Sequence, residues 1–254
     1  MEISVPAEKY DTMDYKALKE NSEKTGVKLW SFHLPFRPFA TLDISSSDKE
    51  LRAHSVKYTA ELIKKAADIG IDKYIVHSGG VFKRESQNEI DERMNYAKES
   101  YAALAEIAAK AGGTVVVENL PPVCVGKDKH EVSELISADD RLRVCFDTNH
   151  LLPGDPVDFI RHFKDKIITI HVSDYDLINE RHWLPGEGAN DFYKIYDALK
   201  EVGYSGIWLY EIGFVNGVTI ERERALTCED FVKNAKEIFE HKPISVISSK
   251  KLCY

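Results

Sequence analysis

The sequence lacks the signals of a disulfide-stabilised, thiolate-zinc or nucleotide-binding protein. Its four cysteines, Cys124, Cys145, Cys228 and Cys253, form no CxxC pair, so neither a thiolate zinc site nor a disulfide framework is indicated. The chain also contains no GxGxxG motif and no P-loop, which leaves no nucleotide fingerprint. These absences favour a cytoplasmic protein in a reducing environment.

Membrane segments and a surplus of positive charge are missing as well. Residues 1–15 show no basic start followed by an apolar stretch, and no run of about 18 apolar residues occurs, so we expect no membrane partner. The net charge of −8 disfavours a broad grip on a nucleic-acid backbone. The 254 residues, 43% hydrophobic and 30% charged, suit a single globular domain over residues 1–254.

Short apolar runs alternate with longer segments of helical pattern. Most of the runs are continuous, which is typical of a parallel sheet covered on both faces. Strands are expected at residues 3–5, 27–32, 73–76, 114–117, 142–146, 167–170 and 207–210. Helices are expected from the N-cap Asp48 to about Ile69, and at residues 88–111 and 191–202. This alternation predicts βαβ units and an α/β fold of the TIM (β/α) barrel type.

The number of strands differs from that of a closed barrel. Seven clear strands are predicted, whereas a (β/α) barrel has eight. Either the first βα unit is missing, or residues 243–248 add a strand near the other end of the chain.

Six of the predicted strands are followed at once by a side chain that can bind a metal or transfer a proton. These side chains are His33, His77, Glu118, Asp147, His171 and Glu211. Their separations, between 24 and 44 residues, each fit one βα unit. Carboxyl ends of parallel strands face one way, so the six residues are expected at the mouth where barrel enzymes keep their active sites. One such residue alone is usually an ordinary loop residue, but six together indicate a shared site.

The chemistry of the six residues favours a bound cation. Clustered imidazoles and carboxylates repel one another and lose hydration unless a cation or a substrate compensates. His150 follows Asp147 by three residues, and Glu180 and His182 lie in the loop after His171. A donor set without thiolate suits one divalent ion, Zn²⁺, Mn²⁺, Co²⁺ or Mg²⁺, between which the sequence does not choose.

Two tryptophans could shape a sugar pocket. Aromatic faces pack well against the C–H faces of sugars, so Trp30 and Trp183 are candidates for substrate binding. Trp30 lies within a predicted strand, and core packing is an equally good explanation for it.

The order of several short segments resembles the xylose isomerase-like TIM barrel superfamily, which includes the sugar phosphate isomerases and epimerases and AP endonuclease family 2. The segments are SFHLPF, YIVHSGG, VVVENLP, VCFDTNH, IHVSDYD, HWLPGEG and LYEIG, and the resemblance runs from Met1 to about Phe239. It implies a metal-dependent barrel enzyme. The homo-oligomers common among these relatives make a homo-oligomer one arrangement to expect.

Similarity to the ketose 3-epimerase branch of this superfamily implies roles for individual residues. The implied metal ligands are Glu118, Asp147, His171 and Glu211. The implied substrate-contacting residues are His33, His77, His150 and His182. In that branch the two glutamates, here Glu118 and Glu211, transfer protons on opposite faces of the substrate through a cis-enediolate. The expected function is therefore isomerisation or epimerisation of a sugar, a sugar phosphate or a cyclitol.

Two alternatives remain at the level of the sequence. The endonuclease IV branch implies three zinc ions and a similar set of ligands, with Glu180 where that branch has an aspartate. The acidic charge and the absence of a DNA-contacting loop after the first strand speak against it. A non-catalytic sugar-binding barrel is the third reading, because no arginine stands in the VSDYD segment after His171, where the epimerase branch uses one.

Overall fold

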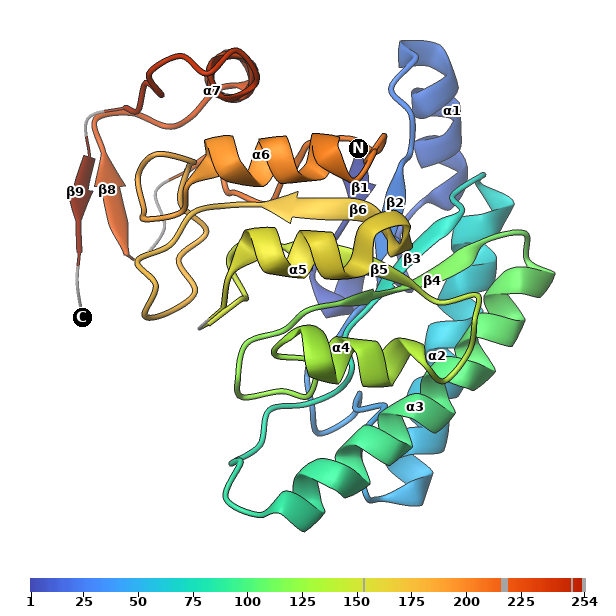
Figure 1. Cartoon of the computed structure of the whole chain (residues 1–254). Coiled ribbons are helices and arrows are strands. Elements are labelled where there is room, and N and C mark those ends of the chain that lie inside the picture. The colour runs from blue at the N-terminus through green and yellow to red at the C-terminus, as the bar shows by residue number, and fades with distance from the viewer. Residues whose placement is uncertain (153, 216–218, 248, 253–254) are drawn as a thin grey trace. The chain divides into compact units, whose positions relative to one another are not determined.

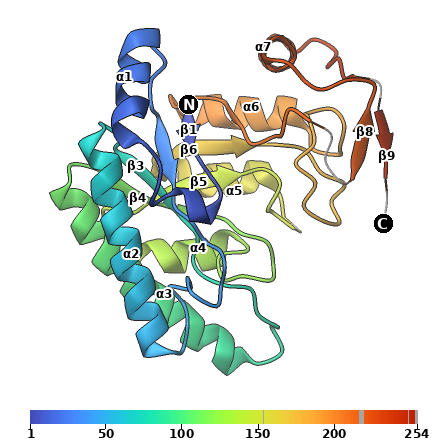
Figure 2. The ribbon, with the colours of Figure 1, turned by 180° about the vertical axis from the view of Figure 1, so that it is seen from behind.

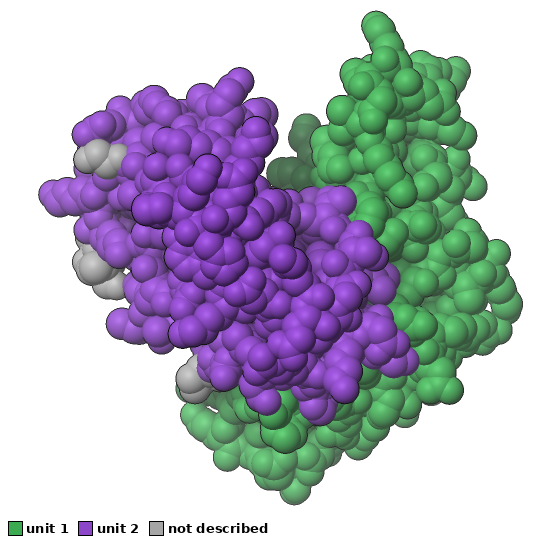
Figure 3. Space-filling model, turned by 45° about the horizontal axis from the view of Figure 1, so that its top comes forward, with its two compact units in different colours: residues 1–145 green, residues 146–254 purple. Residues whose placement is uncertain are grey.

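The computed structural model describes residues 1–152, 154–215, 219–247 and 249–252. Its internal contacts group the chain into two compact units, residues 1–145 (unit 1) and residues 146–254 (unit 2), shown in green and purple in Figure 3. The boundary falls inside strand β5 (Arg143–Asp147), so that unit 2 begins with the last two residues of this strand. The prediction of a single domain over residues 1–254 stays a prediction.

Unit 1 contains a parallel sheet whose strands follow one another in chain order (Figure 1). Its strands are β1 (Glu2–Ile3), β2 (Ser31–His33), β3 (Lys73–Val76), β4 (Thr114–Glu118) and the start of β5. The register places Phe32 beside Tyr74, and Val76 beside Val117. His33, His77 and Glu118, which end or follow these strands, therefore lie at the same edge of the sheet.

The helices of unit 1 begin at polar caps, and all but the first of them contain buried residues. They are α1 (Tyr15–Thr25), α2 (Lys49–Asp68), α3 (Gln87–Lys110) and α4 (Lys129–Ile136), and α2 and α3 pack side by side (Figures 1 and 2). The Asp48 carboxylate accepts the first free N–H groups of α2, which fixes where the helix starts. Leu62 and Ile63 of α2 and Leu104 of α3 are fully buried in the hydrophobic core of this unit.

Unit 2 continues the alternation of strands and helices. Its elements are α5 (Pro156–Phe163), β6 (Ile167–Val172), α6 (Phe192–Glu201), β7 (Leu209–Tyr210), β8 (Ile220–Arg222), α7 (Cys228–Phe239) and β9 (Ser249–Lys251). Strands β6 and β7 are parallel, with His171 beside Leu209 and Val172 beside Tyr210. Strands β8 and β9 form a separate antiparallel pair at one side of the unit (Figure 1).

Each of the seven expected strands overlaps an observed one, and residues 73–76 match β3 at both ends, whereas the first, expected at residues 3–5, shares only Ile3 with β1. The start of the second strand was placed too early: β2 begins at Ser31, and Val27 is exposed. The three expected helices are α2, α3 and α6, each within one residue of the expected limits. Among the described residues, no helix combines the length and the apolar character needed to cross a bilayer.

The alternative strand at residues 243–248 is wrong for the described part of that segment. Residues 242–247 have no regular structure, and residue 248 lies outside the described residues. The Glu237 carboxylate of α7 accepts both the N–H and the hydroxyl of Ser245, at 2.7 and 2.9 Å, which ties the segment to the helix. The strand that does form, β9, starts at Ser249 and pairs with β8.

Candidate active site

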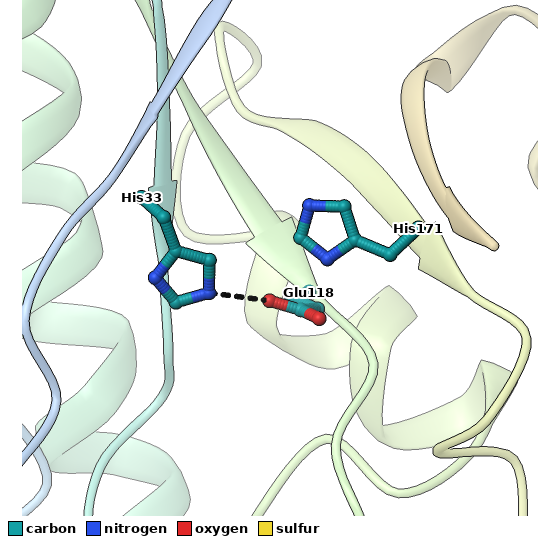
Figure 4. A group of neighbouring side chains, drawn as sticks. All are labelled: His33, Glu118 and His171. Atoms are coloured by element: carbon teal, nitrogen blue, oxygen red, sulfur yellow. Dashed lines mark ion pairs between the residues drawn. The ribbon is translucent and has the colours of Figure 1, made fainter. Parts of the chain in front are cut away.

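Unit 1 brings three of the predicted residues together around one carboxylate oxygen. His33 ends β2, His77 follows β3 and Glu118 ends β4. The Nε2 atoms of His33 and His77 lie 3.3 and 3.1 Å from the same oxygen, Oε2 of Glu118, and Figure 4 marks the His33 contact. The side chain of Glu118 is completely buried. A buried carboxylate needs such partners, because burial of an unpaired charge is strongly unfavourable.

The imidazole rings of His33 and His77 make further contacts that fix their orientation. Nδ1 of His33 lies 3.0 Å from the carbonyl oxygen of Leu34, which can only accept, so the Nδ1 atom carries the proton in that contact. The ring of Phe36 stacks on His77 at a centroid distance of 4.1 Å and an angle of 21°. Each ring is thus fixed with Nε2 toward the carboxylate. Sequence reasoning did not identify Phe36, whose only signal was its position in the SFHLPF segment.

Two buried tyrosines brace the backbone beneath these residues. The hydroxyl of Tyr10 donates to the carbonyl oxygen of His33 at 2.6 Å, and that of Tyr101 to the carbonyl oxygen of Val76 at 2.8 Å. Burial raises the pKa of Tyr10 to about 12 and the pKa of Tyr101 well above its usual value. Both hydroxyls therefore stay protonated and act as fixed donors at neutral pH.

Unit 2 assembles a second group of predicted residues. Nδ1 of His171 in β6 lies 3.7 Å from Oδ2 of Asp147, at the end of β5, and 3.4 Å from Oε2 of Glu211, which follows β7. The ligand atoms of these three residues lie within 4.8 Å of one another. The other oxygen of Asp147, Oδ1, accepts the N–H groups of Asn149 and His150 at 2.5 and 3.1 Å, which orients the carboxylate. Figure 4 draws His171 extending from its strand.

A further group in unit 2 contains the other two histidines predicted for the site, His150 and His182. His150, Glu180 and His182 offer ligand atoms within 4.8 Å of one another. The rings of His150 and His182 face each other edge to face, with centroids 6.0 Å apart. Glu180 is exposed, whereas His150 is buried. The sequence positions of His150, Glu180 and His182 already indicated that they lie near the site, and the resemblance to the endonuclease IV branch implies them as metal ligands.

The loop that carries His182 is anchored by a carboxylate that the sequence did not single out. Asp174 accepts four backbone N–H groups, those of Tyr175, Gly186, Gly188 and Asn190, at 2.7 to 3.1 Å. Burial raises the pKa of Asp174, while the four N–H groups act in the opposite direction. Trp183 pairs with Asp174 through both backbone groups, so the loop is fixed on either side of the turn at Pro185.

The two tryptophans proposed to bind a sugar lie in different surroundings. Trp30 precedes β2, at the end of this strand opposite His33, and the ammonium group of Lys73 lies 4.2 Å from the centroid of a Trp30 ring. Trp183 is 1% exposed, and its indole N–H donates to the hydroxyl of Thr219 at 3.0 Å. Trp183 is therefore a packing residue, and the suggestion that it forms a sugar-binding surface is wrong for this structure. Substrate binding by Trp30 stays a prediction.

The donors of the site fit a divalent cation. The unit 2 group supplies two carboxylates and one imidazole, without thiolate, which is a ligand set used by Zn²⁺, Mn²⁺ and Co²⁺. Asp147 and His171 are completely buried, and negative charge gathered so closely without a cation would be costly. The residues present can therefore hold a metal ion, and they do not specify which one.

Comparison with known proteins supports the architecture over most of the chain. Residues 2–229 match the family described as Xylose isomerase-like TIM barrel. The Uncharacterized protein MJ1311 of Methanocaldococcus jannaschii is 26% identical over 178 residues, which cover 67% of this chain and 60% of that protein. The chain thus spans about 60% of the length of this curated relative.

Solved structures show the same fold. A D-tagatose 3-epimerase-like protein superposes with a TM-score of 0.73 at 24% identity, over 90% of this chain and 81% of that one. An L-ribulose 3-epimerase gives 0.69 at 24% identity, over 83% and 69%. The IOLI protein with a bound zinc atom gives 0.68 at 17% identity, over 81% and 74%. The family match and these structures confirm the predicted α/β TIM barrel fold.

Proposed function

The chain belongs to the xylose isomerase-like TIM barrel family, and on this basis we propose that it is a metal-dependent isomerase or epimerase of a sugar, a sugar phosphate or a cyclitol. The observation that carries the proposal is the convergence of Asp147, His171 and Glu211 in unit 2. The structural relatives described as 3-epimerases support the same kind of reaction. The relative with a bound zinc atom supports a metal in this kind of site.

We propose that Glu118 of unit 1 completes the ligand set of unit 2. One divalent ion would then be held by Glu118, Asp147, His171 and Glu211. When bound, such an ion polarises the oxygens of a ketose and so acidifies the neighbouring C–H group. His33 and His77 orient the Glu118 carboxylate through their contacts with Oε2.

The chemistry of the chain itself would be proton transfer between two carboxylates and one carbon atom. One of Glu118 and Glu211 removes the proton next to the carbonyl, which gives a cis-enediolate. The other returns a proton to the opposite face, which inverts the configuration at that carbon. His150 and His182 would contact substrate hydroxyl groups. Such a reaction exchanges a carbon-bound hydrogen with solvent and needs no oxidant.

The test combines metal content with isotope exchange. Elemental mass spectrometry of protein purified without chelators is expected to find about one divalent ion per chain, and less in Glu211→Gln. The loaded protein should incorporate deuterium from D₂O into one ketose or ketose phosphate of a screened panel. Glu20→Gln, an exposed change in α1, is the matched control and should behave as wild type. A wild-type protein that binds no metal even after reconstitution would exclude this function and leave a non-catalytic sugar-binding barrel.

One observation favours a second candidate, a zinc-dependent hydrolase of the endonuclease IV type. The group formed by His150, Glu180 and His182 offers a further set of ligands beside the first. Metal content separates the two functions, because this enzyme would carry about three zinc ions and would cleave DNA at an abasic site. The net charge of −8 favours the sugar substrate.

A further inference from the structure

Asn149 makes contacts that its neighbours in the metal-binding segment do not make. It lies two residues after Asp147 and is completely buried. Its side-chain oxygen Oδ1 accepts the N–H groups of Arg181 at 2.9 Å and of His182 at 3.3 Å, across 32 and 33 residues of sequence. Because both partners can only donate, the orientation of the amide is fixed, with oxygen toward the loop and nitrogen away from it.

The backbone that Asn149 holds is in an unfavourable conformation. His182 has a φ angle of +51°, in the left-handed region that residues with a side chain rarely adopt. Histidine enters this region more often than most residues do, but less readily than glycine. The two hydrogen bonds to Asn149 on one side and the pairing of Trp183 with Asp174 on the other hold it there.

The consequence of this backbone conformation is a defined place for the imidazole. Nδ1 of His182 lies 3.2 Å from the backbone carbonyl oxygen of Glu211 and 3.4 Å from the hydroxyl of Ser173. A carbonyl oxygen only accepts, so Nδ1 carries the proton and Nε2 keeps its lone pair. The ring also faces His150 at 6.0 Å. His182 can therefore accept a hydrogen bond from a hydroxyl group.

The side-chain nitrogen of Asn149 destabilises the folded state, so packing alone does not explain why an asparagine stands here. Nδ2 is buried and has no hydrogen-bond partner within the described part of the chain. A buried donor without a partner destabilises the folded state, and an apolar side chain of similar shape would avoid that loss. Asparagine at this position is therefore explained by what its oxygen does.

We propose that Asn149 is a positioning residue that sets the place and the tautomer of the His182 imidazole. Its oxygen holds the left-handed backbone of residue 182, and the ring then lies against Glu211 with Nε2 ready to accept from a substrate hydroxyl. The placement follows from the contacts of unit 2, and its meaning for catalysis rests on the proposed function.

Ring nitrogen NMR tests the placement on the metal-free protein. Long-range ¹H–¹⁵N spectra at pH 8, where an ordinary imidazole is neutral, should show His182 as the Nδ1–H tautomer. The His182 signals are identified by their loss in His182→Gln. Asn149→Leu keeps the branched shape of the side chain and removes the acceptor, so it should lose this signature, whereas Asn149→Asp keeps the acceptor and should retain it.

A matched control separates positioning from general destabilisation. Asn234 is also buried and also binds the loop, since its amide donates to the Pro185 carbonyl oxygen at 2.9 Å. Asn234→Leu should lower stability and leave the His182 signature unchanged. A wild-type signature in folded Asn149→Leu, or its loss in Asn149→Asp as well, would overturn the proposal.

Kinetics on the metal-loaded protein add a readout that depends on the proposed function. If deuterium exchange is found, Asn149→Leu should slow it by about 10- to 100-fold at unchanged metal content, and Asn149→Asp should recover part of the loss. Failure of all exchange would count against the proposed function alone, because the NMR result does not depend on it. Unaltered exchange in Asn149→Leu would overturn the catalytic part of the Asn149 proposal.

Discussion

The two glutamates proposed as proton-transfer groups differ in their surroundings. The Glu118 side chain is completely buried between two imidazoles, whereas that of Glu211 is 34% exposed beside His171. The Glu118 side chain is thus shielded from solvent, while water can reach the Glu211 side chain. Such a difference between two carboxylates is a common way to give them different roles in one reaction.

Tyr10 gives a prediction about alkaline pH. Burial raises its pKa to about 12, against about 10 in the unfolded chain. Between these values only the unfolded chain releases the proton, so stability falls as the pH rises, by about 2–3 kcal/mol in total. Urea unfolding from pH 8 to 11.5 should show a shallower fall for Tyr10→Phe, which also loses about 1 kcal/mol at pH 8 through the bond to His33.

The comparison concerns this one hydroxyl, because other buried tyrosines contribute in both proteins. Burial raises the pKa of Tyr74 and of Tyr175 to about 12, and Tyr10 is not among the causes of either shift, so both add equally to the fall in each protein. The same pH dependence in Tyr10→Phe and in wild type would show that the Tyr10 phenol is not held in its protonated form by the folded state.

Gly79, two residues after His77, gives a prediction about close packing. A Cβ atom there would lie 2.1 Å from Oγ of Ser45 and 2.6 Å from Oδ1 of Asp43, and its φ angle is +140°. Gly79→Ala should lower the free energy of unfolding by about 2–4 kcal/mol. Gly112→Ala is the matched control, since its φ is +80° with nothing within 4 Å, and should cost about 1 kcal/mol. Denaturant unfolding that gives equal losses would contradict the close packing at Gly79.

The sequence predicted single residues well where their position follows from a strand end. His33, His77 and Glu118 meet in unit 1, and Asp147, His171 and Glu211 meet in unit 2, because strand register alone brings them to one edge. Asn149 could not be found this way. Its role depends on a loop more than 30 residues away, and no local pattern encodes that contact.

At the scale of elements, the loop between β6 and α6 is fixed to strand β8 by a buried ion pair. Arg222 of β8 binds Glu187 of the loop through two parallel hydrogen bonds, Nε to Oε1 at 2.9 Å and a terminal nitrogen to Oε2 at 2.7 Å. The side chains are 1% and 0% exposed. The same loop carries His182, so this pair restrains the segment that holds a residue of the proposed site.

Breaking this pair on one side should be far more costly than replacing it. Glu187→Gln leaves a buried guanidinium charge opposite a neutral amide, with an expected loss of about 3–5 kcal/mol. The double variant Glu187→Leu with Arg222→Met should lose much less than the sum of the single changes, as measured by urea unfolding in a double-mutant cycle.

An exposed pair of the same geometry is the control. Arg161 binds Glu201 with the same two-bond geometry, but the side chains are 56% and 55% exposed. Glu201→Gln should therefore lower the free energy of unfolding far less than Glu187→Gln does. A small loss in Glu187→Gln as well would mean that the loop does not depend on its connection to β8.

Elements were predictable where periodicity and caps agree, and less so where a strand is short. Asp48 caps α2 as expected, because an acceptor before an apolar period is a local signal. Asp191, expected as the first residue of its helix, is the N-cap of α6. The extent of β2 was not predictable, since Val27 and Leu29 read as strand residues although pairing starts at Ser31. The pairing of β8 with β9 joins segments that lack any local turn signal.

At the scale of the whole molecule, the proposed site needs residues from both units. Unit 1 supplies Glu118 with its two histidines, and unit 2 supplies Asp147, His171 and Glu211. The alternation of strands and helices along the sequence was enough to predict which residues belong to each group, because each of them ends or follows a strand.

A metal titration tests the combination directly. A divalent ion that binds only the folded protein raises the free energy of unfolding by about 2.7 kcal/mol at a concentration 100 times its Kd. Thermal unfolding of wild type with added Zn²⁺ or Mn²⁺ should therefore shift upward, and chelation should reverse the shift. Glu211→Gln and Glu118→Gln should both lose most of it, with Glu20→Gln as the unchanged control. If Glu118→Gln folds and keeps the full shift while Glu211→Gln loses it, the ion is held by unit 2 alone. Glu118 would then be a proton-transfer group that does not bind the metal.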